Sequence, residues 1–276
     1  MELLDWIPSN YLSHILIQFN PNAIDHIEKH HIPKHWYLLS KNPGALPYVY
    51  RDNEMIKHDY WLSNPNPAIV PFIEKCGYGQ LSLAVDDLIS NPNTLHLVNH
   101  RLVSTRLKHL AINTSPLAIE LLEYYIDQLN DYEWSLVSSN PSALSLIKKH
   151  PDRINWFYLS SNPSAIHLLL QKPHLIVWGQ FSKNTHPLAI EHIKKNLNRV
   201  LWSNLSRNPA AIDILKENKD RIDWYMISAN PAIFEYNYPR MAKEKNDIIH
   251  EELMAMALHP DRVEKWLQQG YKLSAI

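Results

Sequence analysis

The chain has 276 residues, of which 45% are hydrophobic, so it holds enough apolar material for one or two globular domains. Its 27 basic and 28 acidic residues nearly cancel, and a net charge of −1 leaves no electrostatic footprint for a nucleic-acid backbone or an anionic membrane. Cys76 is the single cysteine, which excludes a disulfide within one chain and fits a reducing compartment.

The sequence gives no sign of secretion or membrane insertion. The opening residues, MELLDWIPSN, lack the basic and apolar regions of a signal peptide. No uninterrupted apolar run approaches the roughly 18 residues that a membrane-spanning helix needs. We therefore expect a soluble intracellular protein with neither a membrane nor a nucleic acid as its partner.

A motif with a period of about 22 residues recurs along most of the chain. It reads W-x-x-L-S-x-N-P-x-A-I-x-L-L and is clearest after Trp134, Trp156, Trp178, Trp202 and Trp224. Each copy supplies the same apolar residues and no copy supplies a distinctive reactive group. The motif therefore predicts architecture rather than chemistry.

Each copy predicts a small helical hairpin. Asn162 and Pro163 are typical of a helix start, with the asparagine as N-cap and proline in the first helical turn. The apolar residues within Ala165–Leu169 then fall on one side of that helix, and Pro173 ends it. Helices of this length are marginal alone, so neighbouring copies must cover their apolar sides. We expect the tryptophans of successive copies to pack against one another, and each asparagine cap to contribute about 1 kcal/mol.

Taken in chain order, the copies divide the sequence into three parts. Residues 1–20 predict an N-terminal cap, residues 21–238 the helical repeats, and residues 239–276 a C-terminal helical cap. The pattern weakens near residues 75–115, which we interpret as an insertion or kink with degenerate copies. The prolines expected to open helices are Pro21, Pro43, Pro65, Pro92, Pro116, Pro141, Pro163, Pro187, Pro209 and Pro231.

The predicted fold is all-α, an α-solenoid of about ten short helical-hairpin repeats of roughly 22–25 residues with a cap at each end. Units advancing by roughly 8–10 Å would build an arc or rod on the order of 100 Å long. The alternative is a horseshoe of the leucine-rich-repeat type, which has a similar period. Ser135, Gly179 and Ser203 stand where that fold would need an apolar strand residue, which favours the solenoid.

The recurring motif and the later segment MALHPDRVEKWLQQGY resemble the NP-x-A-I repeat proteins that giant nucleocytoplasmic DNA viruses of amoebae and algae encode in many copies. The resemblance covers nearly the whole chain, although the copies around Val85 and His109 depart from the pattern. It implies a viral protein. It carries over no functional residue, because the shared positions all look structural.

No catalytic, cofactor-binding or metal-binding residue is predicted. Three histidine pairs have the i, i+4 spacing of metal ligands, namely His26 with His30, His31 with His35, and His96 with His100, but no third ligand accompanies them. A serine recurs four residues after the tryptophans, which favours a turn or capping role over a nucleophile. The basic residues Arg101, Arg106, Lys108, His109, Lys194, Lys195 and Arg199 have acidic neighbours, so solvated helix faces are expected there. Cys76 is expected to be a small, partly buried residue.

Aromatic residues at variable positions of the motif are the candidate binding residues. Tyr37, Phe157, Tyr158 and Tyr225 stand one or two residues after a tryptophan, and stacked copies would align them along one edge as anchors for a protein partner. The alternative is that they fill gaps between units.

These features predict a non-enzymatic viral repeat protein that acts as a protein–protein interaction scaffold for a viral or host protein. It would act in the host cytoplasm or the virion and would not be secreted. The alternative is a structural component of the virion, either a minor capsid or an internal packaging protein. A weaker alternative is an enzyme with its site in residues 75–115. The oligomeric state is left open.

Overall fold

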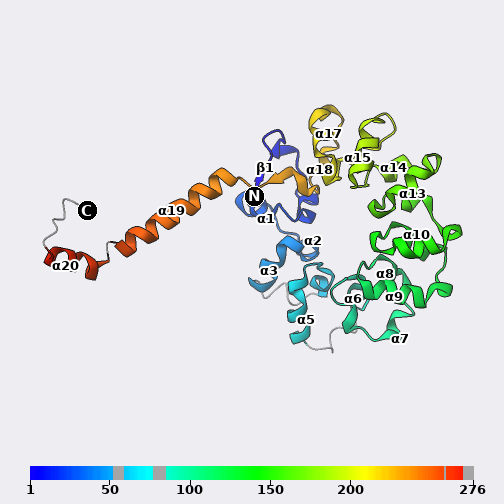
Figure 1. Ribbon diagram of the computed structural model, residues 1–276, viewed down its shortest axis with the longest axis horizontal. Helices are drawn as coiled ribbons and strands as arrows, with labels where there is room; N and C mark the ends of the chain where they lie inside the picture. The colour runs from blue at the N-terminus through cyan, green and yellow to red at the C-terminus, as the bar shows by residue number, and fades with distance from the viewer. Residues whose placement is uncertain (52–58, 77–84, 258, 270–276) are drawn as a thin grey trace. The chain divides into compact units, whose positions relative to one another are not determined.

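The computed structural model describes residues 1–51, 59–76, 85–257 and 259–269, and in these residues the fold is all-α (Figure 1). The chain forms two compact units. Leu3–Phe234 form one, called here the main unit, and Met1–Glu2 together with Glu235–Ile276 form the second unit.

The helices of the main unit are short. They are α1 (Ile24–Lys29), α2 (Trp36–Ser40), α3 (Leu46–Arg51), α5 (Val70–Cys76), α6 (Val85–Ser90), α7 (His100–Val103), α8 (Leu107–Ile112), α9 (Pro116–Tyr124), α10 (Asp131–Ser139), α11 (Leu144–Lys149), α12 (Trp156–Leu159), α13 (Ile166–Gln171), α14 (Trp178–Phe181), α15 (Pro187–Lys194), α16 (Trp202–Ser206), α17 (Ile212–Glu217) and α18 (Trp224–Ile227). The second unit contains α19 (Tyr238–Ala257) and α20 (Pro260–Gln268).

Short 3₁₀ helices join many of these α-helices. They are η1 (Ser9–Tyr11), η2 (Leu16–Phe19), η3 (Pro43–Ala45), η4 (Asp59–Ser63), η5 (Pro67–Ile69), η7 (Leu95–Leu97), η8 (Ile126–Gln128), η9 (Pro141–Ala143), η10 (Pro151–Arg153), η11 (Pro163–Ala165), η12 (Pro173–Leu175), η13 (Pro209–Ala211), η14 (Lys219–Arg221) and η15 (Pro231–Ile233). Two strands of two residues each, β1 (Glu2–Leu3) and β2 (Phe234–Glu235), pair in a two-stranded sheet.

The Asn-Pro steps start helical structure as predicted, but most of them first form a single 3₁₀ turn. The Asn162 side chain accepts a hydrogen bond from the Ser164 N–H, Pro163 begins η11, and α13 follows at Ile166. The proline supplies a fixed φ and needs no hydrogen bond at this position.

The prediction of helix-opening prolines is wrong at three positions. Pro21 and Pro92 lie in turns, and Pro65 is the first proline of a doubled Asn-Pro step in which Pro67 opens η5 instead. Asn66 caps that 3₁₀ helix by accepting from the Ala68 N–H. The sequence does not distinguish these three prolines from helix-opening ones such as Pro163, because all of them follow an asparagine.

The asparagine of each copy does more than cap a helix. The Asn162 side chain is fully buried, and its Nδ2 atom donates to the backbone carbonyls of Ser138 and Asn140 in the preceding copy, both at 3.0 Å. Its Oδ1 atom accepts the Ser164 N–H, so both donors and the acceptor of the amide have partners. The corresponding asparagine makes the same two bonds in each of the remaining copies. It donates to the carbonyl of the asparagine in the preceding copy and to the carbonyl two residues before that asparagine.

We call these residues the ladder asparagines, and each defines one repeat. They are Asn20, Asn42, Asn64, Asn91, Asn113, Asn140, Asn162, Asn184, Asn208 and Asn230. All of them are buried. The ladder runs without interruption through Asn91 and Asn113, where the sequence pattern is weakest.

The ladder also joins the last repeat to the first. Asn20 donates to the carbonyls of Ser228 and Asn230, at 3.3 and 2.7 Å, so the hydrogen bonds of the asparagines form a closed circuit. Asn22 adds a bond to the Pro231 carbonyl at 2.8 Å. The segment predicted as an N-terminal cap therefore contains a full member of the ladder, and the helices of the main unit follow one another around a circle in Figure 1.

A second set of hydrogen bonds runs beside the ladder and involves the repeated serines. Ser160 donates its hydroxyl hydrogen to the Trp156 carbonyl at 2.7 Å and accepts from the Val177 N–H of the next repeat at 3.0 Å. Ser138, Ser182 and Ser206 do the same with their own repeats and the next. At the junction of last and first repeats, Ser228 accepts from the Ser13 N–H at 2.7 Å. The predicted structural role of these serines thus takes the form of links between repeats.

The tryptophans do not form the spine that the sequence indicates. Trp134 is buried, with 2% of its surface exposed, but the indoles at the start of α2, α12, α14, α16 and α18 are only half-buried. Cationic side chains cover several indoles: Arg153 over Trp134, Lys172 over Trp156, Arg199 over Trp178 and Arg221 over Trp202. Buried alanine, isoleucine and leucine side chains such as Ala165, Ile166 and Leu169 form the core between repeats instead.

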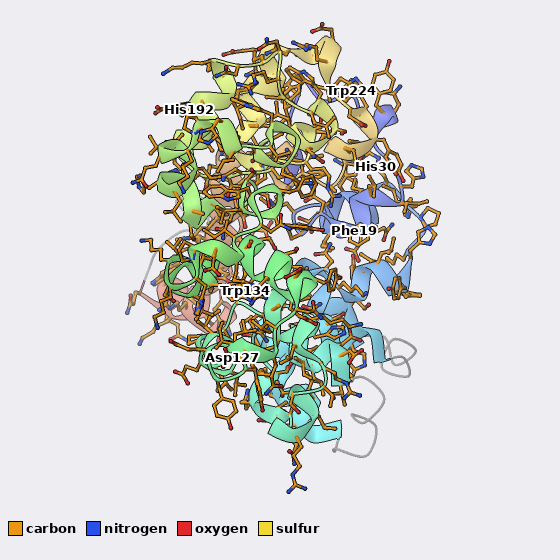
Figure 2. All side chains as sticks on the ribbon, turned by 90° about the vertical axis from the view of Figure 1, so that its right-hand side faces the viewer. Phe19, His30, Asp127, Trp134, His192 and Trp224 are labelled. Carbon is orange, nitrogen blue, oxygen red and sulfur yellow. The ribbon has the colours of Figure 1, made fainter. Side chains whose placement is uncertain are left out.

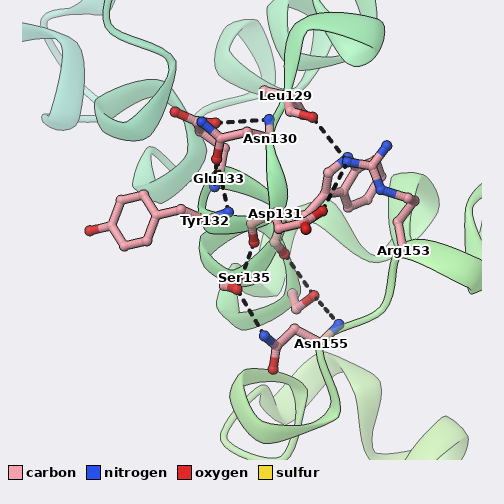
Figure 3. Close-up of polar contacts among 10 residues, drawn as sticks. Leu129, Asn130, Asp131, Tyr132, Glu133, Ser135, Arg153 and Asn155 are labelled. Atoms are coloured by element: carbon pink, nitrogen blue, oxygen red, sulfur yellow. Dashed lines mark hydrogen bonds and ion pairs between the residues drawn. The ribbon is translucent and has the colours of Figure 1, made fainter.

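Figure 3 shows polar contacts between residues 129–135 and the segment that contains Arg153 and Asn155. Arg153 donates to the Leu129 carbonyl at 3.0 Å and lies 3.7 Å from the Asp131 carboxylate, while Asn155 Nδ2 donates to Ser135 Oγ at 2.8 Å. Asn130 and Glu133 form a capping box at the start of α10. Polar groups of one repeat thus fix the position of the next.

Candidate protein-binding surface

In three repeats the residue that follows the tryptophan lies on the outer side of its helix, whereas Ser135 in α10 is buried. In α2, Leu39 and Ser40 face the core, with 0% and 2% of their surface exposed, whereas Tyr37 is 49% exposed. The same division places Phe157 and Tyr225 outside, at 45% and 52% exposure. Three of the four candidate residues are therefore accessible to a partner.

Tyr158 differs from the other candidates because it is half-buried. Its ring packs edge-on against Phe157, with the ring centroids 5.2 Å apart. It stands two residues after its tryptophan. Tyr158 thus fits the gap-filling alternative, and Phe157 is the exposed member of the pair.

Tyr37, Phe157 and Tyr225 each stand five residues before a ladder asparagine, so the same position can be compared in every repeat. This position is occupied by Tyr225, Ile15 and Tyr37 in the last, first and second repeats. In other repeats the described side chains at this position are Asp86, Lys108, Ser135, Phe157, Gly179 and Ser203. The large apolar side chains therefore cluster where the circuit closes.

Two further aromatic residues extend this cluster. Tyr11 is 55% exposed, and its ring lies 5.3 Å from that of Trp224 in the last repeat. Phe19 is 38% exposed and stands four residues after Ile15. Figure 2 shows Phe19 and Trp224 on the same side of the main unit.

We call Tyr11, Ile15, Phe19, Tyr37 and Tyr225 the closure patch. Next to it, Lys41 lies over the Tyr37 ring, with Nζ 4.4 Å from the ring centroid and 2.9 Å from the hydroxyl. An apolar centre with a polar edge is the usual composition of a protein interface. Aligning the copies on asparagine would have identified Ile15, which the tryptophan alignment misses because His14 stands in the tryptophan position.

Residues 75–115, where the weaker alternative places an enzyme site, contain a serine, a histidine and an aspartate that lie close together. Ser90 Oγ lies 3.1 Å from His109 Nδ1, and His109 Nε2 lies 3.2 Å from Asp86 Oδ2. Burial lowers the pKa of His109, and the nearby Asp86 carboxylate opposes that shift. These groups join α6 to α8.

Their geometry differs from that of a catalytic triad. Ser90 donates its hydrogen to the Asp86 backbone carbonyl at 2.6 Å, whereas a nucleophilic serine must donate it to the histidine. The contact of His109 Nε2 with Asp86 lacks hydrogen-bond geometry, and the Asp86 carboxylate is half-exposed and also binds Arg106 Nε at 2.9 Å. The arrangement serves as a polar link between the two helices.

The described histidines can be compared with the spacing of metal ligands. Within the described part of the chain, no three His, Cys, Asp or Glu side chains come together in a way that could hold a metal ion. The His26 and His30 rings are 4.2 Å apart, and burial, together with the nearby His30 and Lys29, lowers the pKa of His26 to about 4. The side chains of Cys76 and His100 lie outside the described residues.

Several of the basic residues that were considered for nucleic-acid binding have acidic partners. Arg106 binds Asp86, and Lys194 lies 3.6 Å from Glu217. Arg199 lies over the Trp178 ring. Among the described helices, none combines the length and the hydropathy that crossing a bilayer requires.

Comparisons of this chain with protein-family models, with curated proteins and with solved structures found no match.

Proposed function

We propose that the main unit is an α-solenoid whose ten helical-hairpin repeats close on themselves, and that it is a non-enzymatic scaffold for binding another protein. The observation that carries this proposal is the closure patch. It gathers five exposed apolar side chains, four of them aromatic, on three successive repeats. Exposed aromatic residues in a contiguous patch are typical anchors of protein interfaces.

The ladder supports a binding role because it makes the surface rigid. Tyr37 and Ile15 stand five residues before asparagines whose amide groups are fully hydrogen-bonded inside the protein. A rigid surface loses little conformational entropy when a partner binds. The expected partner is a protein segment that presents apolar side chains to the patch.

The resemblance of the repeats to the NP-x-A-I proteins of giant viruses supports a viral origin, with a viral or host protein as the partner. A structural role in the virion is the alternative, in which the surface would bind another virion protein. Mass spectrometry of purified particles separates the two, because a structural component would be present at a stoichiometric amount.

Site-specific photo-cross-linking tests the binding surface. A benzophenone amino acid at position 225 is expected to cross-link a defined protein in extracts of infected cells, whereas the same group at the highly exposed Tyr124, outside the patch, should not. The double variant Tyr37→Ser/Tyr225→Ser should weaken binding of that protein by about thirtyfold or more, since the loss of even one anchor residue costs about 2 kcal/mol.

Tyr124→Ser is the matched control and should bind normally. Equal cross-linking from positions 225 and 124, or unchanged binding by the double variant, would contradict the proposed surface.

A further inference from the structure

Helix α19 in the second unit carries an apolar stripe that no described residue of its own unit covers. Every described side chain from Met241 to Met256 is exposed. At 100° per residue, the side chains of Met241, Ile248, Ile249, Leu253 and Met256 fall on one side of the helix, within an arc of about 140°. Their exposed fractions lie between 42% and 63%.

Five of the eight residue pairs in 241–256 are matched about the point between Ile248 and Ile249. Besides these two isoleucines, Asp247 corresponds to His250, Lys245 to Glu252, Ala242 to Ala255, and Met241 to Met256, whereas the pairs 246/251, 244/253 and 243/254 do not match. Within the stripe, Met241, Ile248, Ile249 and Met256 therefore correspond to apolar residues, and Lys245 corresponds to the acidic Glu252. Such a pattern is self-complementary only when a second copy of the helix runs in the opposite direction.

We propose that α19 pairs with α19 of a second copy of this chain, antiparallel and related by a two-fold axis that passes between Ile248 and Ile249. Ile248 of one copy then packs against Ile249 of the other, and Met241 against Met256. Lys245 and Glu252 lie within the apolar stripe, and each faces the opposite charge on the other copy.

A membrane surface fits this helix less well. Helices that lie on membranes have a polar face rich in lysine and arginine, whereas α19 has three basic and four acidic residues. A parallel pair of copies would place Lys245 against Lys245 and Glu252 against Glu252, which disfavours it. The antiparallel pair alone satisfies both charges.

Sedimentation of the full-length chain over a range of concentrations tests the proposal. Because a single helix pair buries less than a standard interface, a monomer–dimer equilibrium with a dissociation constant on the order of 10 µM is expected. The substitutions Lys245→Glu and Glu252→Lys, made separately, should each weaken the dimer about tenfold or more by placing like charges together.

A mixture of the two variants distinguishes the antiparallel pair from other arrangements. When Lys245→Glu and Glu252→Lys chains are combined, both positions again face opposite charges, so the mixture should dimerise about as tightly as the wild type, although each variant alone dimerises about tenfold or more weakly. The variant that carries both substitutions should also dimerise. Lys243→Glu, on the opposite side of the helix, is the matched control and should dimerise like the wild type.

Circular dichroism of each variant checks that its helical content is unchanged. A wild-type chain that stays monomeric at about 300 µM would overturn the proposal, because that concentration lies far above the expected dissociation constant. Single variants that dimerise normally, or a mixture that does not recover, would also overturn it. The dimer does not depend on the closure patch, so Tyr37→Ser/Tyr225→Ser chains should form it unchanged.

Discussion

At the scale of single residues, the ladder asparagine contributes most to the fold. A helix cap uses one oxygen of its side chain, whereas a ladder asparagine such as Asn162 also gives both amide hydrogens to carbonyls of the previous repeat. Those carbonyls are buried, and of the two the Asn140 carbonyl also accepts the Ala143 N–H, at 3.1 Å. An unpaired buried polar group costs about 1–3 kcal/mol, which makes the ladder far more important than capping alone.

Replacing Asn162 with alanine should therefore lower the free energy of unfolding by about 2–4 kcal/mol, because the Ser138 carbonyl and the Ser164 N–H lose the amide as a partner and the Asn140 carbonyl loses one of its two donors. Asn130→Ala, at the exposed capping box of α10, is the matched control and should cost about 1 kcal/mol. Urea denaturation measures both. An equal loss of unfolding free energy for the two substitutions would show that a ladder asparagine stabilises the fold no more than an ordinary helix cap does.

Protonation of His26 should destabilise the main unit at acidic pH. The folded-state pKa is lowered from 6.5 to about 4, so the folded protein binds fewer protons than the unfolded chain between these values. Stability is therefore present above pH 6.5 and is lost as the pH falls toward 4. Between pH 7.5 and 5 this group should account for a loss on the order of 1–2 kcal/mol.

The comparison of wild type with His26→Gln by urea denaturation at the two pH values isolates this effect. The variant should lose less stability on acidification, because glutamine does not titrate. An equal loss in both proteins would contradict the assignment.

At the scale of the repeat, close contact between neighbours limits which residues are tolerated. The carbonyl oxygen of Pro21 in the first repeat lies only 2.2 Å from the place where a Cβ on Gly44 would stand. Other repeats carry asparagine, serine, histidine or alanine at this position, so the glycine reflects one particularly close approach.

Gly44→Ala should lower the free energy of unfolding by about 1–3 kcal/mol, because the backbone of the first repeat must shift. Gly179→Ala is the matched control, since a Cβ there meets only the Leu201 Cδ2 atom at 3.9 Å. In helix α14 that substitution should be neutral or stabilising by about 0.5–1 kcal/mol. Thermal unfolding monitored by circular dichroism compares the two, and a destabilised Gly179→Ala with an unaffected Gly44→Ala would contradict the packing.

The sequence predicts the elements of a repeat better than the contacts between repeats. Asn-Pro steps, apolar spacing and tryptophan positions are local, and they correctly predict an all-α fold of short helices. The ladder joins residues that are 22 to 29 positions apart, and a local pattern cannot distinguish an asparagine that caps from one that also spans two repeats.

The sequence likewise predicts only part of the candidate surface, because the rest depends on contacts between repeats. Tyr37, Phe157 and Tyr225 were found because each follows a tryptophan, and all three are exposed. A tryptophan alignment does not find Ile15, because His14 stands in the tryptophan position of the first repeat. The clustering at the junction depends on closure, which no single repeat encodes.

At the scale of the whole main unit, closure explains why the first repeat needs no separate cap. Asn20 and Ser13 make the same kinds of bonds to the last repeat that other repeats make to their predecessors. Closure is determined by the small rotation between successive repeats, summed over all of them, and this quantity leaves no mark on the sequence of any one copy. An open array and a closed one would share the same motif.

A spin-label distance between positions 11 and 225 tests closure most directly. Both side chains are exposed, and Cys76, the single cysteine, is replaced with serine so that only these two sites are labelled. Because Tyr11 packs on Trp224, a closed circuit predicts one short distance by double electron–electron resonance. In an open array, ten repeats advancing by roughly 8–10 Å would place the labels on the order of 80 Å apart, and that result would contradict the closed circuit.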